Sequence, residues 1–143
     1  MYDIMFIDDD ESLRAHLKSM IDWNGIPIRL VCEAGDSETA WEMFMQYRPM
    51  ILLTDINIPI ISGLELAKKI SAVDQDVRFI VITSYTDFDY VQEAVTLGAV
   101  ELLRKPLSES SVNACLLYTS SFDIFLLHGH HSSLPVFKPD TWI

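Results

Sequence analysis

The sequence of 143 residues contains no apolar run close to the roughly 18 to 20 residues that a helix needs to cross a bilayer. Its N-terminus also lacks the basic segment followed by an apolar segment that marks a secretory signal peptide. Cysteine is scarce: Cys32 and Cys115 are too few and too far apart for a disulfide framework or a metal knuckle. These absences predict a cytoplasmic protein with two reduced thiols and no contact with a membrane.

Basic residues are scarce as well. Ten Lys and Arg stand against 21 Asp and Glu, which gives a formal net charge of -11. Such a charge opposes binding to a phosphate backbone, so we do not expect this chain to bind nucleic acid directly. The length is typical of one domain with its own packed core.

Apolar segments alternate with segments of helical periodicity up to about residue 108. The expected strands are Tyr2–Ile7, Pro27–Ala34, Met50–Thr54, Arg78–Thr83 and Val100–Arg104. The expected helices are 13–21, Thr39–Tyr47, Ile61–Ile70, Asp87–Leu97 and a last one that begins at Ser108. Because the strands are apolar throughout, both faces of the sheet must be covered. We therefore predict an α/β fold, a doubly wound parallel sheet of five strands.

Polar side chains stand where the predicted strands end. Asp8 and Asp9 follow the first strand, and Asp55 follows the third. Thr83 ends the fourth strand, and Lys105 follows the fifth. In a parallel α/β sheet, ligands bind beyond the carboxyl ends of the strands, so these five side chains are expected to converge.

Three carboxylates close together need a cation to offset their repulsion. Oxygen ligands suit Mg²⁺, and a bound Mg²⁺ makes phosphoryl transfer feasible by shielding the incoming anion from the acids. Asp55, in the centre, is predicted to be the nucleophile, with Lys105 as the charge that binds phosphate oxygens and Thr83 as a hydroxyl donor. Asp10 and Glu11 are expected to have another role, to cap and begin the first helix.

The stretches "FIDDDE", "LLTDINIPIISGLEL" and "VITSYTDFDYVQEAVTLGAVELLRKPL" resemble the receiver domain of two-component response regulators. The resemblance covers about residues 1 to 114 and implies a flavodoxin-like fold with strand order 2-1-3-4-5. "SYTDFDYVQEAVTLGA" and "IDWNGIPIRLVCEAGDSETAWE" are most similar to receivers joined to a C-terminal AraC-type helix-turn-helix output domain. We expect no such output domain in this chain.

The resemblance also implies a metal site and its chemistry. Mg²⁺ would be bound by Asp9, Asp55 and the backbone carbonyl of Asn57, with Asp8 acting mainly through water. A sensor histidine kinase would pass its phosphoryl group to Asp55. The domain would catalyse only its own phosphorylation and dephosphorylation, and phosphorylation would promote pairing of two receivers.

Two further residues have implied roles in switching. Thr83 would turn inward to bind the phosphoryl group, and Lys105, which precedes a cis Pro106, would pair with Asp55 or its phosphate. At the position of Leu102 the family usually has an aromatic residue that moves together with the threonine. Leucine departs from that pattern, so the usual coupling is not expected here.

The segment 115–143 does not resemble the end of this fold. We expect a receiver domain over 1–114 and an atypical tail that is either disordered or not native. The sequence "CLLYTS" of Cys115–Ser120 is encoded by TGT CTC TTA TAC ACA TCT, which resembles the transposon-end adapter used in sequencing libraries. On that interpretation the last helix of the receiver is truncated near Ala114.

Two other functions stay open at this point. A Mg²⁺-dependent phosphohydrolase with an aspartate nucleophile uses similar groups, but it usually has a second acid two positions after the nucleophile, where this chain has Asn57. A receiver-like module that binds partners without phosphorylation would not need the acids, Thr83 and Lys105, all of which are present.

Overall fold

The computed structural model describes residues 1–84 and 100–121. Within these residues, five strands form one parallel sheet in the order β2-β1-β3-β4-β5. The strands are β1 (Tyr2–Ile7), β2 (Ile28–Ala34), β3 (Ile51–Asp55), β4 (Arg78–Thr83) and β5 (Val100–Arg104). The expected fold class and strand order are confirmed.

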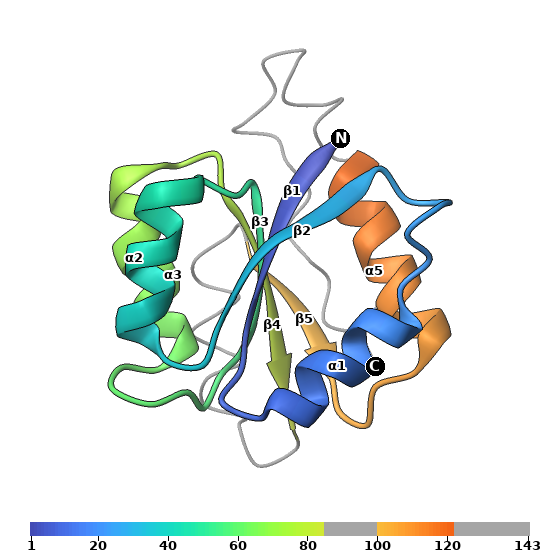
Figure 1. The fold of residues 1–143 in the computed structure, drawn as a ribbon, viewed down its shortest axis with the longest axis horizontal. Coiled ribbons are helices and arrows are strands. Elements are labelled where there is room, and N and C mark those ends of the chain that lie inside the picture. The colour runs from blue at the N-terminus through green and yellow to red at the C-terminus, as the bar shows by residue number, and fades with distance from the viewer. Residues whose placement is uncertain (85–99, 122–143) are drawn as a thin grey trace.

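Helices cover both faces of the sheet (Figure 1). Their bounds are α1 (Glu11–Met20), α2 (Ser37–Tyr47), α3 (Gly63–Val73) and α5 (Glu109–Ser121). The pair α1 and α5 lies on one face, and the pair α2 and α3 lies on the other. The helix expected at Asp87–Leu97 lies outside the described residues. In the described parts of the chain, no helix is long and apolar enough to span a membrane.

Polar side chains determine where the helices begin. The Asp10 carboxylate accepts a hydrogen bond from the backbone N–H of Ser12 at 2.9 Å, and the Asp36 carboxylate accepts one from Thr39 at 2.7 Å. Ser62 caps α3 in the same way. Each of these bonds satisfies an N–H that has no partner within the helix. The capping role expected for Asp10 is confirmed.

The core consists of two apolar clusters, one on each side of the sheet. Met5 and Leu52 belong to the cluster beneath α2 and α3, whereas their neighbours Phe6 and Leu53 belong to the cluster beneath α1 and α5. Successive strand residues point to opposite faces, and both faces are buried. This explains why the strands are apolar at every position. Burial of each such side chain contributes roughly 1.5–3 kcal/mol.

The helix α5 continues through the boundary that we expected after Ala114. Five buried residues on α5 have helical spacing, and they are Val112, Cys115, Leu116, Thr119 and Ser120. This stripe packs on the sheet, which explains why the helix extends to Ser121. Asn113 ties α5 to the end of α1, because its Nδ2 donates to the Met20 carbonyl at 2.9 Å. Beyond Ala114, α5 carries no charged side chain, and residues 122–143 lie outside the described part.

Candidate functional site

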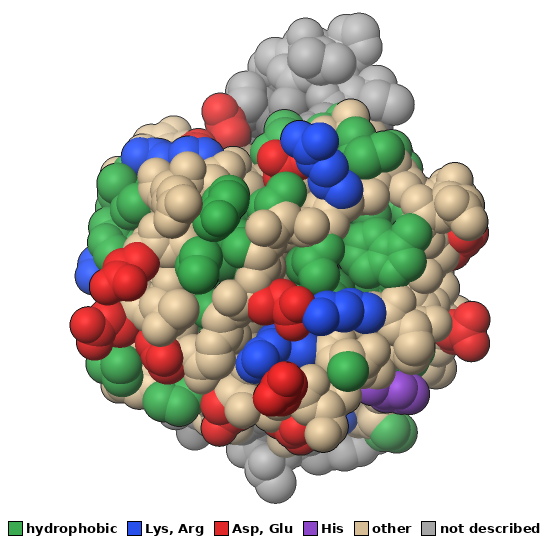
Figure 2. Space-filling view, viewed as in Figure 1, with side chains coloured by type: hydrophobic (Ala, Val, Ile, Leu, Met, Phe, Trp, Pro, Cys, Tyr) green, Lys and Arg blue, Asp and Glu red, His purple; other side chains and the backbone are tan. Residues whose placement is uncertain are grey.

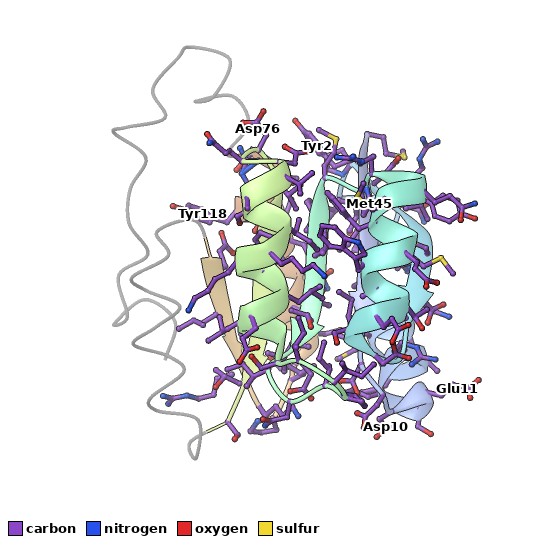
Figure 3. All side chains as sticks on the ribbon, turned by 90° about the vertical axis from the view of Figure 1, so that its left-hand side faces the viewer. Tyr2, Asp10, Glu11, Met45, Asp76 and Tyr118 are labelled. Carbon is purple, nitrogen blue, oxygen red and sulfur yellow. The ribbon has the colours of Figure 1, made fainter. Side chains whose placement is uncertain are left out.

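The carboxyl ends of the strands meet at the lower edge of the sheet in Figure 1. Figure 3 shows Asp10 and Glu11 at this edge, at the end of the molecule opposite to Tyr2 and Asp76. Figure 2 shows several acidic side chains toward the same edge. The loops that follow β1, β3 and β5 and the end of β4 therefore lie in one region, as the parallel topology predicts.

Asp55 is the last residue of β3, and its side chain is nearly buried. The Lys105 Nζ donates to Asp55 Oδ2 at 2.9 Å, and the backbone N–H of Asn57 donates to Oδ1 at 3.1 Å. Both carboxylate oxygens thus have a partner, one of them charged. A carboxylate held in this way keeps a fixed direction toward the edge of the sheet.

Lys105 reaches Asp55 across β4, which lies between β3 and β5. Asp55 pairs with Ile82 in the sheet, and the backbone N–H of Lys105 donates to the Thr83 carbonyl at 2.8 Å. The lysine side chain is partly exposed, with 39% of its surface accessible. The peptide bond between Lys105 and Pro106 is cis, in agreement with the expectation.

Asp8 follows β1 and is 2% exposed. Its backbone N–H donates to the Ala34 carbonyl at 3.0 Å, and its carboxylate Oδ1 accepts from the N–H of Asp10 at 2.8 Å. Its carbonyl oxygen accepts a hydrogen bond from Nη1 of Arg14. The other carboxylate oxygen, Oδ2, is buried and has no hydrogen-bond partner among the described residues. A buried polar atom without a partner is costly, so Oδ2 is suited to a ligand.

The charges at this edge act on one another. Burial raises the pKa of the Asp8 carboxyl to about 6, and the hydrogen bond from Asp10 opposes that rise. The negative charges of Asp55 and Asp9 contribute to this rise, and the positive charge of Lys105 opposes it. Asp8, Asp9, Asp55 and Lys105 are therefore close enough to interact, as expected from the sequence.

The residues present fit a hard cation. Oδ2 of Asp8, which has no partner among the described residues, and the Asp55 carboxylate are oxygen atoms that can bind a metal ion. Asp9 and Asn57, which are close in sequence to these two residues, are exposed. In residues 1–84 and 100–121, no three His, Cys, Asp or Glu side chains are grouped so that they could hold a metal by themselves. Mg²⁺ tolerates such a site, because it is usually held by one or two carboxylates and keeps several waters.

Thr83 lies at the end of β4 and is 4% exposed. Its hydroxyl donates to the Ser84 carbonyl at 3.3 Å. Binding of an anion at Asp55 by this hydroxyl therefore requires a different orientation of the side chain. Leu102 is buried in the cluster beneath α2 and α3, where its side chain serves packing.

Two contributions to the site were not predicted from the sequence. A Cβ atom on Gly63 would overlap the Asp55 carbonyl oxygen and lie 3.1 Å from Thr54 Oγ1, so only glycine allows α3 to begin this close to β3. Arg14, which lies on α1, donates a hydrogen bond to the Asp8 carbonyl and so fixes the loop after β1. The glycine after the Ser62 cap was a signal for the close approach of α3 to Asp55. No local pattern indicated the hydrogen bond from Arg14 to Asp8.

A family model, the response regulator receiver domain, matches residues 4–116. The chain belongs to this family. Receiver domains are signalling domains of two-component systems, and the expectation drawn from the sequence motifs is confirmed.

Two transcriptional regulatory proteins are similar to this chain in sequence. The receiver domain is 34% identical over 116 residues to the uncharacterized transcriptional regulatory protein YesN of Bacillus subtilis, covering 81% of this chain and 32% of YesN. It is 28% identical to the transcriptional regulatory protein HptR of Staphylococcus aureus, covering 81% of this chain and 45% of HptR. The chain thus spans less than half the length of these curated relatives.

Two solved structures of response regulators are similar to this chain. The REC domain of AraT, a response regulator from Geobacillus stearothermophilus, has a TM-score of 0.80 and 29% identity, covering 89% of this chain and 98% of that one. A two-component transcriptional regulator AraC from Clostridium phytofermentans has a TM-score of 0.81 and 26% identity, covering 90% and 98%. The expected similarity to receivers of AraC-type regulators is confirmed.

Proposed function

We propose that this receiver domain accepts a phosphoryl group on Asp55 from a sensor histidine kinase. The observation that carries the proposal is the pairing of Asp55 Oδ2 with Lys105 Nζ at 2.9 Å, at the edge where a buried carboxylate oxygen of Asp8 has no partner among the described residues. A nucleophilic carboxylate, a cation for phosphate oxygens and further acidic oxygens that can hold a metal ion are the parts that phosphoryl transfer to an aspartate needs.

The proposed metal ligands are Asp9, Asp55 and the backbone carbonyl of Asn57, with Asp8 acting through water. When bound, Mg²⁺ would neutralise the charge that develops on the transferred group. At this edge, a cation near Oδ2 of Asp8 would also stabilise the charged form of a carboxyl whose pKa burial raises to about 6. The acids at this edge therefore favour binding of a divalent cation over an empty site.

In the proposed transfer, an oxygen of Asp55 attacks the phosphorus of a phosphohistidine. The new P–O bond forms as the P–N bond breaks, and the electron pair of the P–N bond returns to the imidazole of the kinase. The Lys105 ammonium, already 2.9 Å from Oδ2, is positioned to stay with the oxygens of the incoming group. Hydrolysis of the aspartyl phosphate later resets the domain, so the chain acts as a switch without turning over a separate substrate.

We further propose how the phosphorylated state differs from the free one. The Thr83 hydroxyl leaves the Ser84 carbonyl and donates to the phosphoryl group. This hydrogen bond to the phosphate exists only in the active state and therefore favours that state. This bias would promote receiver pairing and act on a DNA-binding output domain such as AraC-type regulators possess. The two free thiols, Cys32 and Cys115, agree with action in the cytoplasm.

Acetyl phosphate with Mg²⁺ provides the test. Intact-mass spectrometry is expected to show one added phosphoryl group on the wild-type chain, none without Mg²⁺, and none on Asp55→Asn. Asp76→Asn, which changes an exposed aspartate at the opposite end of the sheet, is the matched control and should be labelled like the wild type. Labelling that persists in Asp55→Asn would refute the site. Repeated release of phosphate from small phosphomonoesters would instead favour a phosphohydrolase.

A further inference from the structure

Arg14 connects three elements at the candidate metal site. Arg14 is the fourth residue of α1; its Nη1 donates to the carbonyl oxygen of Asp8, and its Nε donates to Glu33 Oε1 on β2 at 3.1 Å. The side chain is 17% exposed. The guanidinium therefore lies between the loop after β1 and the edge strand, and holds one against the other.

The anchor of Arg14 is itself held in place. Lys18, one turn further along α1, has its Nζ 2.5 Å from Glu33 Oε2, so each oxygen of this carboxylate has its own cation. Figure 2 shows basic side chains beside an acidic one on the face that carries β2 and α1. A carboxylate shared by two cations in this way has little freedom to turn, and neither has the guanidinium fixed to it.

The position of Arg14 is unfavourable for the helix alone. A cation near the N-terminus of a helix is repelled by the positive end of the helix dipole, which favours acids such as Glu11 there. The Arg14 guanidinium also lies beside the loop that is proposed to bind a divalent cation, and the two positive charges repel each other. A gain elsewhere must offset both costs, and the contact with the Asp8 carbonyl supplies one.

That contact completes the fixation of Asp8. The Ala34 carbonyl holds its N–H, the Asp10 N–H holds Oδ1, and Arg14 holds its carbonyl oxygen. Only Oδ2 is left without a partner among the described residues. The peptide group that Arg14 binds joins Asp8 to Asp9, so fixing it also sets the direction in which the Asp9 side chain leaves the backbone.

We propose that Arg14 is a positioning residue for the metal site. It touches neither the metal nor the phosphoryl group, and acts by holding the peptide between Asp8 and Asp9 in the conformation that binds the cation. This inference rests on the proposed function, because it assigns a role at the same Mg²⁺ site. Groups that orient metal ligands typically change metal affinity by about 10- to 100-fold when they are removed.

The sign of the effect distinguishes positioning from electrostatics. Arg14→Gln removes a positive charge beside a cation site, so charge alone predicts tighter Mg²⁺ binding. Loss of positioning predicts weaker binding, because the loop must then be ordered at the expense of binding energy. A merely structural role would lower the melting temperature and leave the Mg²⁺ affinity of the folded protein unchanged.

The experiment is a calorimetric titration of the full chain with Mg²⁺, alongside thermal unfolding of each variant. Arg29→Gln is the matched control, since Arg29 forms a similar pair with Asp3 at 2.5 Å, at the other end of β1. We expect a dissociation constant for Mg²⁺ about 10-fold higher in Arg14→Gln and unchanged in Arg29→Gln. Affinity in Arg14→Gln that equals or exceeds that of the wild type overturns the inference.

A second variant covers the case in which Arg14→Gln does not fold. Arg14→Lys keeps the charge, but an ammonium cannot reproduce the fork that reaches Asp8 and Glu33 together. Weaker Mg²⁺ binding in folded Arg14→Lys supports positioning, and wild-type affinity overturns it. A wild-type chain that binds no Mg²⁺ overturns the proposed function as well, whereas normal wild-type binding with unaffected variants overturns this inference alone.

Discussion

Lys105 Nζ donates to Asp55 Oδ2 across 2.9 Å, which joins the ends of β5 and β3 although β4 lies between them. The pairing has opposite consequences for the two ligands that we propose for this edge. The ammonium assists a phosphoryl group, which is negative, and opposes a metal cation that uses the same carboxylate.

Lys105→Gln should therefore slow phosphorylation while strengthening Mg²⁺ binding. Loss of a charged donor for the transferred group is expected to reduce the rate with acetyl phosphate about 100-fold. The same loss removes a positive charge beside the acids, so the dissociation constant for Mg²⁺ should fall. Lys68→Gln, exposed on α3, is the control and should change neither quantity. Weaker Mg²⁺ binding in Lys105→Gln would contradict the proposed arrangement.

Asp8→Asn should stabilise the metal-free protein and weaken metal binding. The variant removes a buried carboxylate whose Oδ2 has no partner within residues 1–84 and 100–121 and whose pKa is raised to about 6, so at pH 8 we expect a gain of about 1–2 kcal/mol in EDTA. Mg²⁺ affinity should fall about 10-fold. Asp10→Asn keeps its capping oxygen and is the control. Urea unfolding measures the change in stability, and calorimetry measures the change in Mg²⁺ affinity. An Asp8→Asn protein that is less stable than the wild type would contradict the claim that Oδ2 of Asp8 destabilises the metal-free protein.

Gly63→Ala should destabilise the domain at the candidate site. The added Cβ would overlap the backbone carbonyl of Asp55, so α3 must move, at a cost of about 2 kcal/mol. Gly35→Ala is a useful contrast, because its Cβ would meet nothing closer than 3.7 Å. That substitution should be neutral or stabilise by about 0.5 kcal/mol through the unfolded state. Equal urea midpoints for the two variants would contradict the steric argument.

Ile60→Asn should stabilise the protein. Ile60 has a φ of 83°, a left-handed backbone conformation that is rare for β-branched residues, and its side chain is 70% exposed. Asparagine tolerates this conformation and gives up little buried apolar surface, so a gain of about 1 kcal/mol is expected. Ile60→Val keeps the branched Cβ and should show no gain. Thermal unfolding of both variants checks the difference.

Stability should fall as the pH rises from about 4.5 to 7 because of Glu101. Burial raises the pKa of this carboxyl from 4.5 to about 7, with a partly offsetting hydrogen bond from Cys115 Sγ at 2.8 Å. The folded state therefore holds a proton that the unfolded state has lost, and the stabilisation present below pH 4.5 disappears as the pH passes 7.

The expected loss attributable to Glu101 is about 3 kcal/mol at most. Asp8 contributes in the same direction up to about pH 6. Glu101→Gln isolates the first contribution, and its stability should vary less with pH than that of the wild type. Glu109→Gln, exposed on α5, should retain the wild-type profile. Urea unfolding at several pH values, in the presence of a reductant, would reveal whether the two profiles separate.

Much of the fold could be predicted because its signals are local. The apolar runs Tyr2–Ile7 and Arg78–Thr83 are strands with the expected bounds. The helix starts differ from the expected ones by two residues. The helices α2 and α3 begin at Ser37 and Gly63, directly after the caps Asp36 and Ser62, and not at Thr39 and Ile61. The end of α5 could not be located, since Leu116 and Thr119 are held by burial against the sheet rather than by an amphipathic pattern with charged residues.

The sequence by itself determined the set of functional side chains. A parallel sheet brings the ends of its strands to one edge, so Asp8, Asp55 and Lys105 had to converge once five apolar strands alternated with helices. The tertiary structure alone decided how these groups are held. The bond from Arg14 to the Asp8 carbonyl and the close approach of Gly63 to Asp55 depend on how α1 and α3 pack against the sheet, and no local sequence pattern encodes that packing.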